Sequence, residues 1–170
     1  EKKDSGTYDK ILAVVVIMLL IPMVVTTVKR NFLWKDTLTL MEHDIVDLQQ
    51  SAKANYIYAG NLKVKLFSEL REGVPINNKQ VEVNRIIESY QQAVKVYPDY
   101  YQAWNQLGSV YLTLFMDFKN ANKYFMKALE IRNDFLPAHY NLAFSYQKLQ
   151  DTSQAIFHYK EVLNINPGHT

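Results

Sequence analysis

The chain has 170 residues, of which 48% are apolar, a proportion that is ordinary for a folded protein. Its formal net charge is +2, so it lacks the basic excess that is typical of nucleic-acid binding. Cysteine is absent, which excludes disulfides, thiolate metal sites and cysteine nucleophiles. Because the first residue is glutamate rather than methionine, we expect the chain to be a fragment of a longer protein.

The first predicted element is an apolar run over residues 11–28, which contains no charge and has basic residues on both sides. As a helix this run would be about 27 Å long, close to the thickness of the hydrocarbon core of a bilayer. We therefore expect a juxtamembrane segment over residues 1–10 and a transmembrane helix over residues 11–30. The basic residues before and after the run are nearly equal in number, so they do not fix its orientation.

Two alternatives compete with the transmembrane helix. A secretory signal has an apolar core of roughly 7–15 residues and a cleavage site with small side chains. The run is longer than that, and Thr26, Thr27 and Val28 make a poor cleavage site. A buried helix of a globular core normally shows a polar face, and this run shows none. Both alternatives therefore explain the run less well than a membrane span does.

Residues 31–50 are predicted to form a connecting amphipathic helix. Leu38, Met41, Ile45 and Leu48 follow one another at helical steps, so they would share one face. Asp36, which precedes them, is a suitable N-cap because its side chain can accept hydrogen bonds from the first free backbone amides.

From residue 51 to residue 170 the dominant signal is internal repetition. Segments 99–133 and 134–167 are similar to each other: Gly108 and Ala143 are 35 residues apart, and Ala121 and Ala155 are 34 apart. The difference of one residue predicts an insertion in the turn around Met116. A degenerate copy over residues 51–98 precedes these two, and a turn-rich insertion of about a dozen residues lengthens its hairpin.

These repeats resemble the tetratricopeptide repeat, a pair of helices with a 34-residue pattern of tryptophan, leucine, glycine and tyrosine, then alanine and phenylalanine. Small side chains such as Gly108 and Ala121 let paired helices approach closely, and large ones such as Trp104 and Phe125 fill the spaces between them. The predicted fold class is therefore all-α: one transmembrane helix followed by a solenoid of tetratricopeptide-like helical hairpins.

A second resemblance concerns the junction between the membrane segment and the repeats. Its residues are Arg30, Asn31, Trp34, Lys35, Asp36, Asp44, Ile45 and the stretch 51–54. They are similar to the segment that joins the last membrane helix to the repeats in the transmembrane-and-tetratricopeptide-repeat family of GT-C-type protein O-mannosyltransferases. The resemblance implies that the chain is the C-terminal part of such a protein. The simpler alternative is that Trp34 is an interfacial anchor, Arg30 a flanking charge and Asp36 a helix cap.

Catalytic, metal-binding and cofactor-binding patterns are absent from the sequence. No histidine has the spacing of a metal-ligand motif, and His139 replaces the packing tryptophan of its repeat, which favours a packed ring over a ligand. No glycine-rich phosphate loop or nucleophile elbow occurs. The family's catalytic acidic residues lie in an earlier loop, so none is carried over to this chain. Whether the longer protein is an enzyme stays open.

The predicted binding site is the concave surface that stacked hairpins leave along their first helices. In the resembled repeats, the inward-pointing positions correspond here to amides, hydroxyls, aromatic rings and one lysine: Gln102, Asn105, Gln106, Ser109, Tyr140, Asn141, Phe144 and Lys148. Asn141 resembles the asparagine with which some repeat proteins bind a peptide main chain. The alternative is that these residues only solvate the concave surface.

We therefore expect a membrane-anchored protein-interaction module, whose partners are a protein or peptide and the membrane, with no nucleic acid and no cofactor. The family resemblance implies that the module recruits protein substrates for a glycosyltransferase, with its repeats on the periplasmic or lumenal side. The alternative is a non-enzymatic scaffold or assembly subunit of a membrane protein complex.

Overall fold

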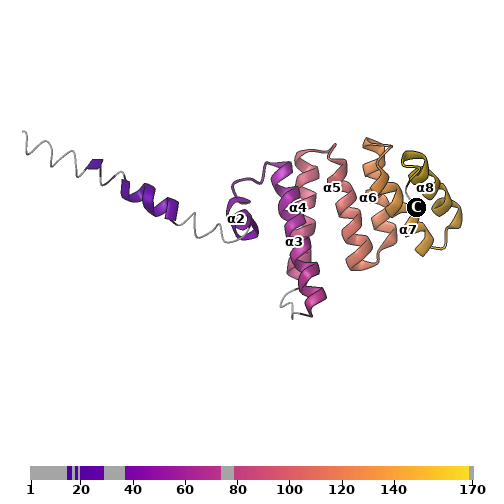
Figure 1. Cartoon of the computed structure of the whole chain (residues 1–170), viewed down its shortest axis with the longest axis horizontal. Helices are drawn as coiled ribbons and strands as arrows, with labels where there is room; N and C mark the ends of the chain where they lie inside the picture. The colour runs from indigo at the N-terminus through magenta and orange to yellow at the C-terminus, as the bar shows by residue number, and fades with distance from the viewer. Residues whose placement is uncertain (1–14, 17, 19, 29–36, 74–78, 169–170) are drawn as a thin grey trace, which may run out of the picture. The chain divides into compact units, whose positions relative to one another are not determined.

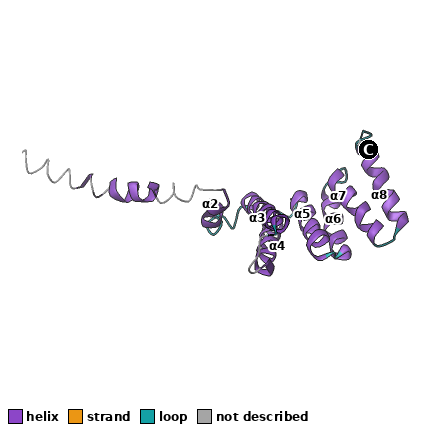
Figure 2. Cartoon of the chain, turned by 60° about the horizontal axis from the view of Figure 1, so that its bottom comes forward, coloured by secondary structure: helices purple, strands orange, loops and turns teal. Residues whose placement is uncertain are grey.

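A computed structural model of the protein describes residues 15–16, 18, 20–28, 37–73 and 79–168. Every regular element in these residues is helical (Figures 1 and 2). The chain divides into two compact units, residues 1–44 and residues 45–170, and each is described by itself.

In the N-terminal unit, residues 20–28 are helical, and so are the described residues just before them. The hydroxyls of Thr26 and Thr27 both donate hydrogen bonds to the carbonyl oxygen of Met23, at 2.9 and 2.8 Å. Among the residues that the structure describes, no helix combines the length and the apolar character needed to cross a membrane. The predicted juxtamembrane segment and both ends of the predicted transmembrane helix lie outside the described residues, so the membrane span stays a prediction.

The predicted connecting helix is shorter than expected. The observed helix α2 covers Thr37–Asp44, and residues 45–50 form turns, while the predicted N-cap lies outside the described residues. Ile45 and Leu48 therefore do not extend the helix. The turn is held by α3, since the side-chain nitrogen Nδ2 of Asn55 donates to the carbonyl oxygen of Gln49 at 3.0 Å. Such a bond uses a carbonyl that a continuing helix would have occupied.

Three antiparallel helical hairpins make up the second unit, and neighbouring hairpins pack through α4 on α5 and through α6 on α7 (Figure 1). This confirms the all-helical solenoid within the described residues. Their elements are α3 (Ala52–Glu72) with α4 (Lys79–Val96), α5 (Tyr101–Val110) and the π-helix η1 (Tyr111–Phe115) with α6 (Phe118–Ile131), and α7 (Leu136–Lys148) with α8 (Thr152–Ile165).

Close helix contacts occur where small side chains were predicted. Ala121 is completely buried and Ala155 is 5% exposed. A Cβ atom added to Gly108 would lie 2.5 Å from a ring carbon of Phe125, which is itself completely buried. The second hairpin is therefore packed at a separation that only glycine permits at this position.

The extra residue of the second hairpin lies inside its first helix, and not in the turn around Met116 as the sequence spacing predicted. The amide of Asp117 donates to the carbonyl oxygen of Tyr111, six residues back. In the third hairpin the equivalent bond runs from Asp151 to Tyr146, only five residues back. The π-helical turn η1 absorbs the additional residue, because its hydrogen bonds span one residue more than those of an α-helix.

One side-chain position ties each hairpin to the turn that precedes it. Asn55 donates to the carbonyl oxygen of Gln49, and the indole of Trp104 donates to that of Pro98 at 2.7 Å. Nε2 of His139 lies 2.9 Å from the carbonyl oxygen of Asn133. In all three hairpins the bond reaches six residues back, so Asn55, Trp104 and His139 are structural equivalents.

The first hairpin projects beyond the other two (Figure 1). Helix α3 has 21 residues, whereas α5 has 10 and η1 adds 5. Counted from the equivalent residues Asn55 and Trp104, residue 66 of α3 corresponds to Phe115 at the end of η1. Residues 67–72 therefore form an overhang, which ends at Gly73 in the left-handed conformation with φ of 67°.

Candidate protein-binding site

The predicted surface residues of the second and third hairpins are joined by an amide pair. Nδ2 of Asn141 on α7 donates to Oδ1 of Asn105 on α5 at 3.1 Å. Asn105 is 6% exposed, while Asn141 is only partly buried. Within the described residues, Oδ1 of Asn141 accepts no hydrogen bond, so it remains available to a backbone amide of a partner.

Lys63 of α3 joins the first and second hairpins in a comparable way. Its ammonium group donates to Oε1 of Gln106 at 2.5 Å and lies 3.4 Å from the hydroxyl of Ser109. Gln106 and Ser109 are both predicted site residues on α5. We call the surface defined by Lys63, the Gln106–Ser109 pair and the Asn105–Asn141 pair the first-helix surface.

The remaining predicted residues are more scattered. Gln102 is half-buried near the start of α5. The ammonium of Lys148 lies 5.1 Å from the ring centroid of Phe144, on the same helix. Tyr140 is 46% exposed and packs edge-on against Tyr159 of α8, with ring centroids 6.2 Å apart. The structure thus brings four of the eight predicted residues, Asn105, Gln106, Ser109 and Asn141, into contacts that cross between hairpins.

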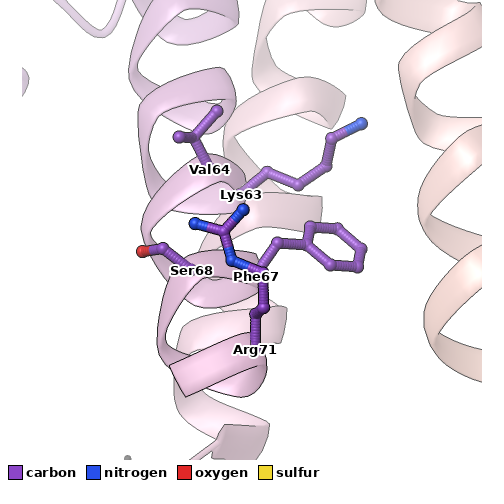
Figure 3. A pocket seen from close by; sticks show the side chains of 5 residues that line it. All are labelled: Lys63, Val64, Phe67, Ser68 and Arg71. Atoms are coloured by element: carbon purple, nitrogen blue, oxygen red, sulfur yellow. The ribbon is translucent and has the colours of Figure 1, made fainter.

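A hollow of about 480 Å³ opens beside Lys63, and the prediction from sequence missed it. Figure 3 shows the five side chains that line it, all from α3: Lys63, Val64, Phe67, Ser68 and Arg71. Lys63, Phe67 and Arg71 are spaced by four residues, so they form one stripe along the helix. That spacing was the available signal, although the residues next to the stripe, Leu62 and Leu66, belong to the core.

The site offers hydrogen-bonding groups and apolar surface but no reactive group. Within the described residues no cluster of three or more histidine, aspartate, glutamate or cysteine side chains could hold a metal ion. His139 is 6% exposed and hydrogen bonded on both ring nitrogens, as expected for a packed ring. The geometry is suited to holding a protein segment.

These hairpins define a class of helical-repeat protein that presents an extended surface to other proteins. More specifically, residues 101–135 and 137–169 each match the tetratricopeptide repeat family, so the second and third hairpins are tetratricopeptide repeats. The first hairpin is outside these matches, although it stacks on the second through α4 and α5.

Solved structures with the same fold include several of MamA. One, a crystal structure of MamA, is 19% identical and has a TM-score of 0.61, covering 76% of this chain and 67% of the MamA chain. A MamA RS-1 double mutant is 15% identical with a TM-score of 0.62, covering 76% and 64%. The Arabidopsis OM64 TPR domain is 16% identical with a TM-score of 0.51, covering 68% and 88%.

The chain therefore spans about two thirds of the length of the MamA chains that it resembles. At these identities the likeness concerns the fold alone. A comparison with curated proteins finds no significant match.

Proposed function

We propose that the chain is a membrane-tethered module that holds a segment of another protein on its first-helix surface. The observation that carries this proposal is the pair of cross-hairpin contacts, Lys63 with Gln106 and Asn141 with Asn105. Each contact fixes a polar side chain across two hairpins and leaves hydrogen-bonding capacity unused, on the Lys63 ammonium and on Oδ1 of Asn141. Preorganised donors and acceptors of this kind lower the cost of ordering side chains on binding.

The proposal includes a membrane tether and a place in a larger protein. The apolar run over residues 11–28 supports the tether, and the junction residues similar to those of GT-C-type protein O-mannosyltransferases support the larger protein. In this proposal the chain is the C-terminal arm of such an enzyme, with its repeats on the periplasmic or lumenal side. There it recruits protein substrates to a catalytic part located elsewhere in the enzyme.

The binding function is tested with peptides selected from a random display library against the full chain. Replacing Asn141 with alanine removes the acceptor Oδ1 and the donor to Asn105, so selected peptides are expected to bind about tenfold more weakly. Asn164→Ala is the matched control, because Asn164 is exposed on α8 and bonds only to Glu161 of its own helix. Affinities are measured by fluorescence anisotropy. If the unsubstituted chain and both variants bind the peptides equally well, the peptides bind to a surface that does not include Asn141.

The tether is tested by fractionation of cells that express the chain. Residues 11–28 are expected to retain the protein in the membrane fraction through a carbonate wash, and deletion of residues 1–30 is expected to release it. A chain that washes off with residues 1–30 intact rules out the membrane span. Retention without any effect of the Asn141 variant on peptide binding would instead favour a scaffold that uses a different surface.

A further inference from the structure

The charge of Lys63 has no acidic partner within the described residues. The side chain is half-buried between α3 and α5, and its ammonium group is bonded only to the neutral oxygens of Gln106 and Ser109. Burial lowers the pKa of Lys63 from its usual value of 10.5, because desolvation disfavours the charged form. A carboxylate at this place would offset that cost and occupy the remaining hydrogen-bonding capacity of the ammonium.

A second cation lines the same hollow. Arg71 lies two helical turns beyond Lys63, and its guanidinium group points back along α3 towards Val64 and Lys63 (Figure 3). It forms no ion pair with any residue that the structure describes. The hollow is therefore lined by two cations and no acidic residue, a charge distribution that complements an anionic ligand.

Apolar surface lies between the two cations. Val64 is 69% exposed and Phe67 is 39% exposed, although both are large apolar side chains. In Figure 3 the Phe67 ring extends to the side of α3 that faces the second hairpin. Exposed apolar groups that are rimmed by charge are typical of a surface that binds another protein.

The hollow depends on the length of this chain's first hairpin. Phe67, Ser68 and Arg71 all lie in the overhang, beyond the residue that corresponds to the end of η1. In the second hairpin the position that corresponds to Phe67 is Met116, a turn residue with φ of 53°. In the second and third hairpins the first helix has already ended at this point, and the chain turns into α6 and α8.

We propose that the overhang hollow binds an acidic protein segment that carries a large apolar side chain next to its carboxylates. Lys63 and Arg71 bind the carboxylates, and Val64 with Phe67 contacts the apolar side chain. This inference rests on the proposed binding function and specifies the chemistry of the partner.

The test uses the full chain and three labelled peptides, read by fluorescence anisotropy. The first peptide has a leucine flanked on each side by two glutamates. The second replaces the glutamates with glutamines, and the third replaces the leucine with serine. The glutamate peptide is expected to bind at least about tenfold more tightly than either of the others. Its affinity should fall as salt is raised, because charge pairs at a partly exposed site are screened.

Variants locate the binding. Lys63→Met keeps the aliphatic stem and removes the charge. It is expected to weaken binding of the glutamate peptide about tenfold and to leave binding of the glutamine peptide unchanged. Arg71→Gln and Phe67→Ser lie on the exposed overhang and give independent readings if Lys63→Met unfolds the chain. The matched control is Lys65→Met, since Lys65 is exposed on the same helix but does not line the hollow.

Each result decides for or against the inference. Equal binding of the glutamate and glutamine peptides, or an equal loss with Lys65→Met, overturns it. So does the absence of binding at about 1 mM peptide. In these cases the proposed binding function still stands if library-selected peptides lose affinity with Asn141→Ala, so the two failures are distinguishable.

Discussion

Replacing Gly108 with alanine is expected to destabilise the repeats by about 2 kcal/mol, because the added methyl group overpacks a closed helix contact. The new Cβ would lie 2.5 Å from a ring carbon of Phe125 and 3.0 Å from the carbonyl oxygen of Ala121. Both residues are completely buried, so neither can move aside without disturbing the hairpin. This cost exceeds the gain of about 1 kcal/mol that alanine normally provides over glycine within a helix.

Gly60 is the matched control for this substitution. It also lies within a helix, but the nearest atom to an added Cβ is the Tyr90 hydroxyl oxygen at 3.8 Å, an ordinary contact. Gly60→Ala is therefore expected to stabilise the chain by up to about 1 kcal/mol. Urea unfolding followed by circular dichroism gives both free energies of unfolding. Two variants that change stability in the same direction and by the same amount would show that the α5–α6 contact is looser than described.

The spacing of small and large residues predicted the hairpins because it reports directly on helix contacts. Gly108, Ala121 and Phe125 have the sizes that their contacts require, so the pattern is visible without the structure. The site of the insertion was not visible in the same way. An extra residue between Tyr111 and Asp117 can lengthen a turn or form a π-helical turn, and both give the same spacing in the sequence.

The repeat register predicted only part of the candidate site. Asn105, Gln106, Ser109 and Asn141 follow from the repeat register, and the structure places them in cross-hairpin contacts. The repeat register does not identify Lys63 or the overhang as part of the site, since the first copy is degenerate and its long helix has no counterpart in the later copies. Only the length of α3 relative to α5 shows that Phe67 and Arg71 extend past the second hairpin.

A buried histidine pair replaces an aromatic stack in the third hairpin. In the second hairpin Trp104 stacks on Tyr124 with ring centroids 6.1 Å apart. At the equivalent positions Nδ1 of His139 and Nδ1 of His158 lie 3.0 Å apart, and both rings are almost fully buried. The carbonyl oxygen of Asn133 can only accept a hydrogen bond, so Nε2 of His139 carries its proton. Nδ1 of His139 then accepts from Nδ1–H of His158, which requires no charge on either ring.

This arrangement makes the third hairpin sensitive to acid. Burial, together with the neighbouring His139, lowers the pKa of His158 from 6.5 to about 4, and Glu161 opposes the shift only weakly. Tyr146 stacks on the His158 ring, with ring centroids 5.7 Å apart. In the unfolded chain His158 therefore binds a proton near pH 6.5, whereas in the folded chain it binds one only near pH 4. Stability is fully present above pH 6.5 and falls as the pH is lowered through this window.

The chain is accordingly expected to lose about 2 kcal/mol of stability between pH 7 and pH 5, at 1.36 kcal/mol for each pH unit below 6.5. The double variant His139→Trp and His158→Tyr recreates the Trp104–Tyr124 pair, which does not titrate in this range, and should lose much less. Urea unfolding at the two pH values measures the difference, with carboxylates largely ionised at both. If the unsubstituted chain is equally stable at pH 7 and pH 5, His158 is not held neutral by burial. If the double variant instead keeps the full pH dependence, the titrating group lies elsewhere in the chain.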